Sequence, residues 1–299
     1  MAQLYDSIAH NKRNSVFIII AFILIVGALS YFIGILFATP FIGLIIGLFF
    51  VIFMTLIGYY SGGSLILKMH HAKEVSKKDD PYLVNTVEGL ALAAGIPMPK
   101  VYMIKEDSPN AFATGRDPKH ASVTVTSGLR NIMNRQELEG VLAHEMSHIK
   151  NLDIRYMMLV TILAGVVALL SDFILRSFLW GGARSHQRRS GGGVLLVLIL
   201  IGIALAVLSP IIAQIIKFAA SRQREFLADA SGALLTRNPS GLASALKKIR
   251  DAKDKVVDDA NKATAHLFIE NPLRGLGGMN QLFSTHPDIN QRIQRLEKM

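Results

Sequence analysis

The residues best suited to chemistry lie in the stretch Val141–Asn151, which reads VLAHEMSHIKN and comes just before a long apolar run. On a helix, His144 and His148 share one face because they are four residues apart, so both imidazoles can reach one metal ion. Glu145 is placed to take a proton from an attacking water and not to bind the metal. This His-Glu-x-x-His pattern is typical of zinc proteases, and two solvated histidines on a polar helix are the alternative.

A pair of acidic residues further along the chain supplies the third metal ligand that the two histidines still need. A catalytic zinc has three protein ligands and one open position. The segment REFLAD, residues 224–229, places Glu225 and Asp229 four residues apart. Glu225 is predicted to bind the zinc, and Asp229 to accept the free ring N–H of a ligand histidine. Alternatively, both carboxylates only pair with Arg222 or Arg224 on a solvated helix.

Long apolar runs indicate that the chain crosses a membrane. Runs of about 20 apolar residues match the roughly 30 Å hydrocarbon core of a bilayer. No charged residue occurs in Val16–Tyr60 or in Val194–Ile216. The predicted transmembrane helices are Val16–Ala38, Phe41–Tyr60, Tyr156–Leu175 and Val194–Ile216.

These four helices divide the chain into four parts. Residues 1–60 are predicted to form an N-terminal transmembrane hairpin, and residues 156–216 a second one. Residues 61–155 and 217–299 are then two parts of one polar catalytic domain. Because the second hairpin joins these parts, it brings the helices that carry His148 and Glu225 side by side at the membrane surface. The predicted fold is therefore α+β, mostly helical, with four transmembrane helices.

The distribution of positive charge predicts the orientation. All but four of the 32 Lys and Arg residues lie in residues 1–15, 61–155 and 217–299, and such residues collect on the cytoplasmic side. We therefore expect a multi-pass protein of the cell (plasma) membrane with a cytoplasmic catalytic domain. The loop between the third and fourth helices opposes this orientation, and the depth of the second hairpin stays open. Its four arginines are Arg176, Arg184, Arg188 and Arg189.

Local signals predict the elements of the polar parts. Asn134 and Glu137 have the spacing of a capping box, which starts the helix that carries His144. Gly95 and Pro97 end an earlier helix. The predicted strands are Lys100–Ile104, Ala111–Thr114 and Ala121–Thr126. The other predicted helices are Pro81–Ala94, Ser221–Leu235, Ser240–Val256 and Pro287–Lys298.

Composition excludes several classes of site and partner. The chain contains no cysteine, so disulfides and cysteine-bound metals are excluded. The formal net charge is +10 at pH 7, but the Lys and Arg residues are scattered and have no aromatic residues between them. We therefore predict no nucleic-acid partner and assign the excess charge to the cytoplasmic face of a lipid bilayer.

Four linked motifs, HEMSH, REFLAD, SPNAFATG and FSTHPDINQRI, make the whole sequence similar to the HtpX family of membrane zinc metalloproteases, relatives of the CAAX prenyl proteases. The resemblance implies one Zn²⁺ per chain and a zincin-like catalytic domain. It also implies cleavage of membrane or misfolded proteins in membrane-protein quality control, with the roles given above for Glu145 and the ligands. Since this chain has fewer transmembrane helices than the prenyl proteases, we do not expect prenylated substrates.

The resemblance adds two further assignments, and helix position adds an expectation for Arg292. Asn110, Ala111 and Phe112 match the family's edge strand over the cleft, which can pair with an extended substrate backbone; an ordinary edge strand is the alternative. His286 matches a histidine near the zinc that could donate a hydrogen bond to the oxyanion. Alternatively, His286 caps the last helix. Arg292 is expected to point toward the same site.

Two other classes of protein stay open at this point. A non-catalytic adaptor would keep the fold and bind unfolded segments, and zinc content near zero would favour it. A transporter would need ionisable residues inside its helices, and Asp172 alone makes a poor ion path. The motifs do not encode the substrate's identity or the oligomeric state.

Overall fold

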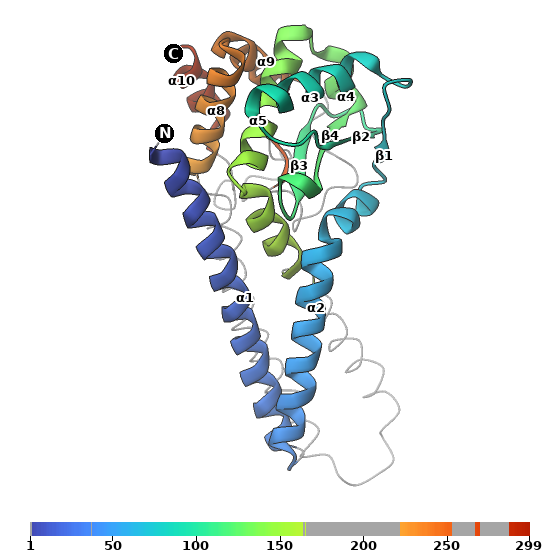
Figure 1. Cartoon of the computed structure of the whole chain (residues 1–299), viewed down its shortest axis with the longest axis vertical. Coiled ribbons are helices and arrows are strands. Elements are labelled where there is room, and N and C mark those ends of the chain that lie inside the picture. The colour runs from blue at the N-terminus through green and yellow to red at the C-terminus, as the bar shows by residue number, and fades with distance from the viewer. Residues whose placement is uncertain (1, 37, 164, 166–221, 253–266, 270–286) are drawn as a thin grey trace.

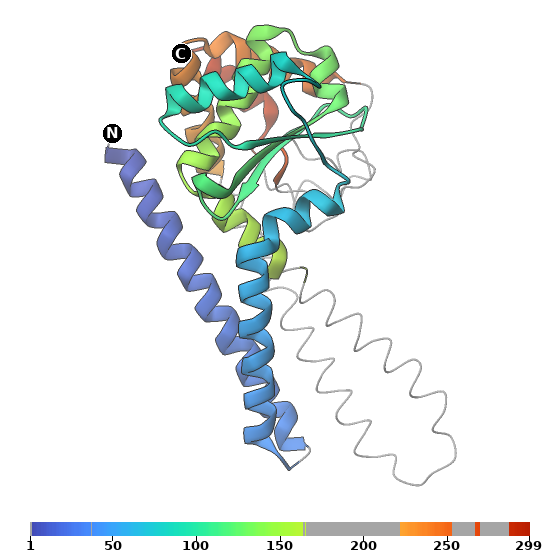
Figure 2. The same ribbon diagram turned by 45° about the vertical axis from the view of Figure 1, so that its right-hand side comes forward.

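The computed structural model describes residues 2–36, 38–163, 165, 222–252, 267–269 and 287–299 (Figure 1). A long helical hairpin, formed by α1 (Ala2–Leu36) and α2 (Pro40–Met69), extends from a head that contains the sheet and most of the other described helices. The helical residues 153–163 leave the head and pack against the hairpin. The hairpin and the head stay distinct when the molecule is turned (Figure 2).

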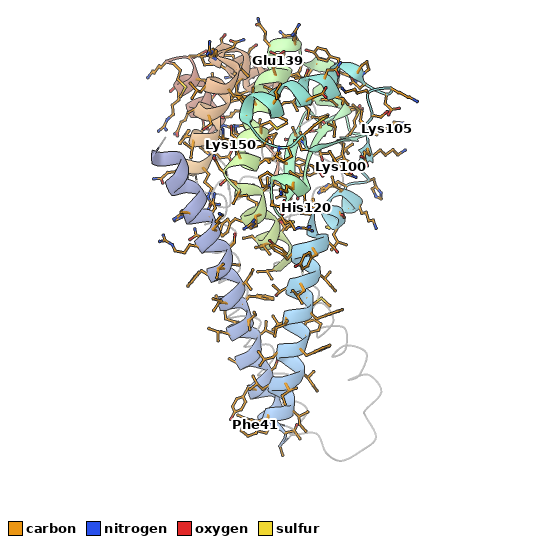
Figure 3. All side chains as sticks on the ribbon, in the orientation of Figure 1. Phe41, Lys100, Lys105, His120, Glu139 and Lys150 are labelled. Atoms are coloured by element: carbon orange, nitrogen blue, oxygen red, sulfur yellow. The ribbon has the colours of Figure 1, made fainter. Side chains whose placement is uncertain are left out.

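The hairpin exposes large apolar side chains. Phe41 at its tip is 70% exposed and Phe49 is 73% exposed, whereas charged residues such as Lys100 lie on the head (Figure 3). Two stretches, Ala9–Ala28 and Pro40–Met69, are long and apolar enough to cross a membrane. Apolar side chains exposed along helices of this length are expected where a surface faces lipid.

The observed helices are longer than the two predicted transmembrane segments, because the backbone stays helical beyond the apolar run. α1 begins at Ala2 and α2 continues to Met69. Of the predicted helix Tyr156–Leu175, only residues 156–163 and 165 are described, and they are helical. The predicted helix Val194–Ile216 lies outside the described residues.

A four-stranded sheet with the order β1-β2-β4-β3 forms one layer of the head. β2 (Lys100–Ile104) runs parallel to β4 (Ala121–Thr126), and β3 (Ala111–Gly115) runs antiparallel to β4. β1 (Lys73–Glu74) is a short antiparallel edge strand that the sequence analysis did not predict. β3 forms the other edge, and its five residues are buried.

Helix α5 (Arg135–Lys150) is central to the head. It packs against α3 (Pro81–Ala94), β3 and β4, and its Val141, Leu142 and Met146 are fully buried in the core. The predicted capping box is present: the Asn134 side chain accepts from the Glu137 N–H, and the Glu137 carboxylate accepts from the Asn134 N–H. α5 therefore begins where its own sequence directs.

The remaining helices complete the layer around α5. α8 (Arg222–Thr236) and α9 (Pro239–Asp251) pack directly on α5, and α10 (Ile289–Leu296) packs on both of them. Where a predicted end falls on described residues, it lies within two residues of the observed one, a difference typical of frayed ends. The predicted ends at Ser221 and Val256 lie outside the described residues. The short helices α4 (Ser127–Ile132) and η1 (Pro118–His120) were not predicted.

Candidate metal centre

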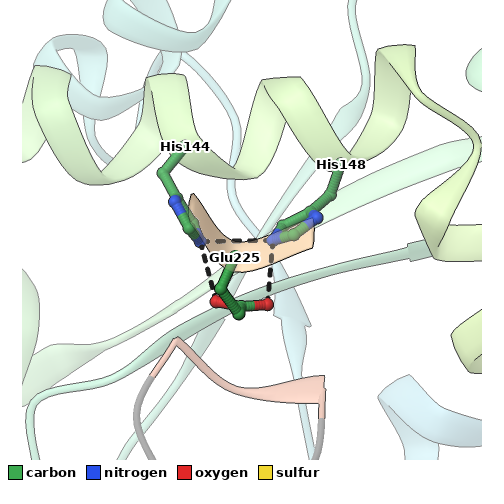
Figure 4. Close-up of side chains that lie close together, drawn as sticks. All are labelled: His144, His148 and Glu225. Atoms are coloured by element: carbon green, nitrogen blue, oxygen red, sulfur yellow. Dashed lines mark hydrogen bonds and ion pairs between the residues drawn. The ribbon is translucent and has the colours of Figure 1, made fainter. Parts of the chain in front are cut away.

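Helix α5 presents His144, Glu145 and His148 inside the head. Their exposed fractions are 0%, 2% and 6%, so they do not form the solvated polar face that was the alternative interpretation. The two histidines point to the same side of the helix (Figure 4), as a spacing of four residues requires.

Helix α8 brings Glu225 opposite the two histidines. Its approach to α5 is close because α8 carries Gly232, where an added Cβ would lie 2.9 Å from the backbone nitrogen of His144. Glu225 and Asp229 are 4% and 2% exposed. Both carboxylates are thus buried and do not lie on a solvated helix.

Three ligand atoms converge between the two helices (Figure 4). The Nε2 atoms of His144 and His148 are 3.2 Å apart. The Glu225 carboxylate lies 3.6 Å from each of them, through Oε2 toward His144 and Oε1 toward His148. Within the described residues these three side chains form a group that can hold a metal ion.

Each histidine is held from behind by an aspartate. The Nδ1 atom of His144 lies 2.9 Å from Asp229 Oδ1, and that of His148 lies 2.9 Å from Asp153 Oδ2. An Nδ1–H that donates to a carboxylate fixes the tautomer in which Nε2 carries the free lone pair. Sequence reasoning anticipated this contact for Asp229 but did not find Asp153.

The signal for Asp153 was weak because a five-residue separation does not place two side chains on one face of a continuous helix. Helix α5 ends in a turn at residues 151–152. Leu152 in this turn adopts a left-handed conformation with φ of +61°, which is uncommon for leucine. The helix that restarts at residue 153 therefore turns Asp153 back toward His148.

The carboxylates dominate the electrostatics of this centre. Burial alone would lower the pKa of His144, but hydrogen bonds to Asp229 and Glu225 outweigh it and raise that pKa to about 9. Burial alone would also lower the pKa of His148, but the hydrogen bond to Asp153 opposes this, and the pKa of His148 is raised as well. Burial would raise the pKa of Asp229, but Arg292 and His144 hold it below its usual value. Asp229 is therefore an ionised acceptor.

Glu145 differs from Asp229 because burial decides the direction in which the pKa of its carboxyl shifts. Loss of solvent raises the pKa of its carboxyl, and the nearby His144 and His148 only partly oppose this. A carboxylate with a raised pKa is a stronger base than an exposed one.

Arg292 reaches the same centre, as the sequence analysis expected. This side chain is fully buried and binds Asp229 through one edge of its guanidinium, with Nε donating to Oδ2 at 2.9 Å and Nη2 donating to Oδ1 at 2.7 Å. Its Nη1 donates to the carbonyl of Ile269 at 2.8 Å and lies 3.5 Å from Glu225 Oε2. A bidentate arginine fixes the orientation of the carboxylate that it binds.

The strand predicted to bind substrate, β3, lies at the edge of the sheet. One backbone group on its outward side is already hydrogen-bonded within the protein. The Ile269 N–H donates to the carbonyl of Ala111 at 2.9 Å. Because outward-facing residues alternate along an edge strand, the outward backbone groups of β3 belong to Ala111, Ala113 and Gly115. The Phe112 ring is buried, and its centroid lies 5.0 Å from the centroid of the Phe268 ring. Asn110, just before β3, is 2% exposed.

His286, the predicted oxyanion donor, lies outside the described residues. Its assignment therefore stays a prediction from the sequence.

The chain is similar to known peptidases. Residues 77–299 match the family described as Peptidase family M48. The chain is 45% identical over 296 residues to a Protease HtpX homolog of Caldanaerobacter subterraneus subsp. tengcongensis, covering 99% of this chain and 98% of the relative. It is 43% identical over 299 residues to a Protease HtpX homolog of Tropheryma whipplei (strain Twist), with coverage of 99% and 98%. The crystal structure of S. mikatae Ste24p gives a TM-score of 0.49 at 19% identity, over 99% of this chain and 66% of that one.

The resemblance seen in the sequence motifs is confirmed by the extent of these matches, which include three quarters of the chain in the family match and nearly all of it in the relatives. The metal-binding group on α5 and α8 lies within the matched region, and two of the described helices are long and apolar enough to cross a membrane. The chain therefore belongs to peptidase family M48 and is a membrane-associated metalloprotease.

Proposed function

We propose that this metalloprotease uses one zinc ion per chain, bound by His144, His148 and Glu225. The spacing of the three ligand atoms is the observation that carries the proposal. Two ligands that each lie about 2.0–2.1 Å from a tetrahedral zinc are roughly 3.3 Å from one another. The distances of 3.2 Å between the Nε2 atoms and 3.6 Å from each to the carboxylate are close to that value.

The chemistry of the donors also suits zinc. Two imidazoles and one carboxylate form a common set of protein ligands for catalytic zinc. Both imidazoles donate from Nδ1 to a buried aspartate, which raises the basicity of Nε2. When bound, zinc supplies a Lewis acid that polarises the scissile carbonyl.

We propose that Glu145 is the general base. It follows the first ligand histidine directly, and burial raises the pKa of its carboxyl toward the pH range where a base is most effective. Glu145 takes a proton from the attacking water and then delivers it to the leaving amine. His286 is proposed, from the family resemblance, to donate a hydrogen bond to the oxyanion.

We further propose that the substrates are membrane or misfolded proteins. An extended segment can add to the edge of β3, where backbone hydrogen bonds give affinity with little side-chain preference. Because Ile269 holds the Ala111 carbonyl, substrate addition at that point requires Ile269 to be displaced. The distribution of Lys and Arg supports a four-helix orientation with the catalytic domain in the cytoplasm.

The direct test compares the parent protein with Glu145→Gln in detergent. We expect both to bind zinc, measured by elemental analysis, and only the parent to cleave itself and a loosely folded test protein. Glu139→Gln is the matched control and should cleave like the parent, because Glu139 is only half-buried and pairs with Arg135 in the first turn of the same helix. Cleavage by Glu145→Gln at the parental rate would remove Glu145 as the base, and zinc-free parent protein would reject the proposed metal.

A further inference from the structure

Helix α1 has one continuous buried face, which packs against the helical residues 153–163 and against α2. Its members recur every three or four residues and are Asn11, Ser15, Ile18, Phe22 and Val26. The apolar members pack in one cluster with Val51 of α2 and with Tyr156, Val160 and Leu163. Asn11 is the polar end of the face and lies closest to the head, because the helix that it meets follows directly from α5.

The Asn11 side chain reaches directly behind the metal centre. Its Nδ2 donates to Asp153 Oδ1 at 2.6 Å and to the carbonyl of Asn151 at 2.9 Å. The other carboxylate oxygen of Asp153, Oδ2, accepts from His148 Nδ1 at 2.9 Å. Asn11, Asp153 and His148 thus form an unbroken chain of hydrogen bonds between α1 and a predicted metal ligand.

The amide of Asn11 fixes the rotation of the Asp153 carboxylate. That carboxylate is 3% exposed, and Arg224 Nε lies 3.8 Å from Oδ1, beyond hydrogen-bond distance. Asn11 therefore supplies the short hydrogen bond to Oδ1, while its second bond holds the turn at Asn151 that places Asp153. Without the amide, the carboxylate can rotate away from His148, and the imidazole loses its fixed direction.

We propose that Asn11 is a positioning residue for His148, so that the seating of the N-terminal membrane helix controls how tightly the centre holds its metal. The proposal rests on the zinc site proposed above. Asn11 contacts no ligand atom of the metal, and its effect passes through Asp153.

The first measurement is zinc affinity, by competition with a chelator, for the full-length protein in detergent. Asn11→Ala should bind zinc about tenfold more weakly, near the lower end of the range for residues that orient metal ligands. Asn14→Ala is the matched control, because Asn14 lies one turn further along α1 and its side chain bonds to His10 within the same helix. Asn14→Ala should bind zinc like the parent, and equal affinity of both variants would overturn the proposal.

A double-mutant cycle separates positioning from general destabilisation. If Asn11 acts through Asp153, Asn11→Ala should cause no further loss of zinc affinity in an Asp153→Ala background. Full additivity of the two losses would overturn the proposal. Thermal unfolding of the metal-free proteins should show a lower midpoint for Asn11→Ala than for Asn14→Ala, because Asn11→Ala loses buried hydrogen bonds. The loss of zinc affinity is therefore judged from the cycle and not from the midpoint. If Asn11→Ala protein does not fold, Asn11→Gln replaces it, since its longer side chain keeps the amide but moves it from Asp153.

Failure of this proposal is distinguishable from failure of the zinc site itself. A parent protein that binds no zinc overturns both, whereas zinc-loaded parent and Asn11→Ala proteins of equal affinity overturn only the role of Asn11.

Discussion

The two ligand histidines are supported in parallel ways by different parts of the molecule. The His144 side consists of His144, Asp229 and Arg292, and the His148 side consists of His148, Asp153 and Asn11. The distance from Nδ1 to the aspartate is 2.9 Å on both sides. On the His144 side a bidentate guanidinium from the C-terminal helix holds the aspartate. On the His148 side a neutral amide from the N-terminal helix donates the short hydrogen bond, and Arg224 adds only a longer ion pair at 3.8 Å.

This difference indicates different physical roles. A buried charged pair such as Asp229 and Arg292 is costly to break, because either partner alone is an uncompensated buried charge. The amide of Asn11 carries no charge, so its loss costs a hydrogen bond and an orientation. The His144 side therefore contributes to the stability of the head, and the His148 side links the metal centre to the membrane hairpin.

The largest expected effect comes from removing the ligand that both sides share. Glu225→Ala should reduce bound zinc to background and abolish cleavage, because a catalytic zinc needs three protein ligands. Elemental analysis and a cleavage assay measure this. Gln223→Ala, an exposed change on the same helix, should retain both metal and activity. Unchanged metal content in Glu225→Ala would reject Glu225 as a ligand.

Breaking the charged support of the His144 side should have the next largest effect. Arg292→Met leaves Asp229 buried without its counter-ion, which should cost about 3–5 kcal/mol of unfolding free energy. Denaturant unfolding of the metal-free protein in detergent measures the change. Gln294→Met, on the exposed face of α10, should stay within about 0.5 kcal/mol of the parent. Equal stability of the two variants would contradict the assignment.

The two aspartates allow a direct comparison of the sides. Asp153→Asn and Asp229→Asn should each weaken zinc binding by about 10–100-fold. Only Asp229→Asn should also destabilise the metal-free protein strongly, since it removes the bidentate carboxylate of the fully buried Arg292. Asp153, in contrast, pairs with the partly exposed Arg224 only at 3.8 Å. Zinc competition and denaturant unfolding give the two numbers for each variant. A similar loss of stability in both would erase the proposed difference between the sides.

The smallest expected effect lies away from both sides, at the start of α3. Burial would raise the pKa of Asp80, but hydrogen bonds from Arg130 and the Leu83 N–H outweigh it and hold the pKa below 3.8. Asp80 therefore stabilises the fold fully above its ordinary pKa and loses this contribution as the pH falls through its lowered value. Asp80→Ala should cost about 1 kcal/mol at neutral pH and leave zinc affinity unchanged.

Unfolding of the metal-free parent and Asp80→Ala proteins across the acid range tests this prediction. Their difference in stability should shrink below pH 3.8, the ordinary value for this carboxyl. A difference that stays constant through that range would show that the lost contribution is not the ionised carboxylate.

Several features of this protein were determined by local sequence. The bounds of α3, β2 and β4 agree with the predictions, because a cap, a proline or an alternating pattern acts over a few residues. α5 begins at the predicted capping box, and the spacing of His144 and His148 alone places their rings on one face. The candidate ligands could therefore be predicted, since helix geometry relates residues four apart whatever surrounds them.

The sequence indicated Asp229 as one support of a ligand histidine, but only the tertiary structure decided that Asp153 is the other and which residues hold the two aspartates. Arg292 meets Asp229 across 63 positions of the sequence, and Asn11 meets Asp153 across 142. The pairing of Ile269 with the edge of β3 was equally hidden, although the strand itself was predicted. Contacts of this kind depend on how α1, α8 and α10 pack around α5. Local periodicity determines which side chains share one face of a helix, but only tertiary packing determines which residues lie opposite that face.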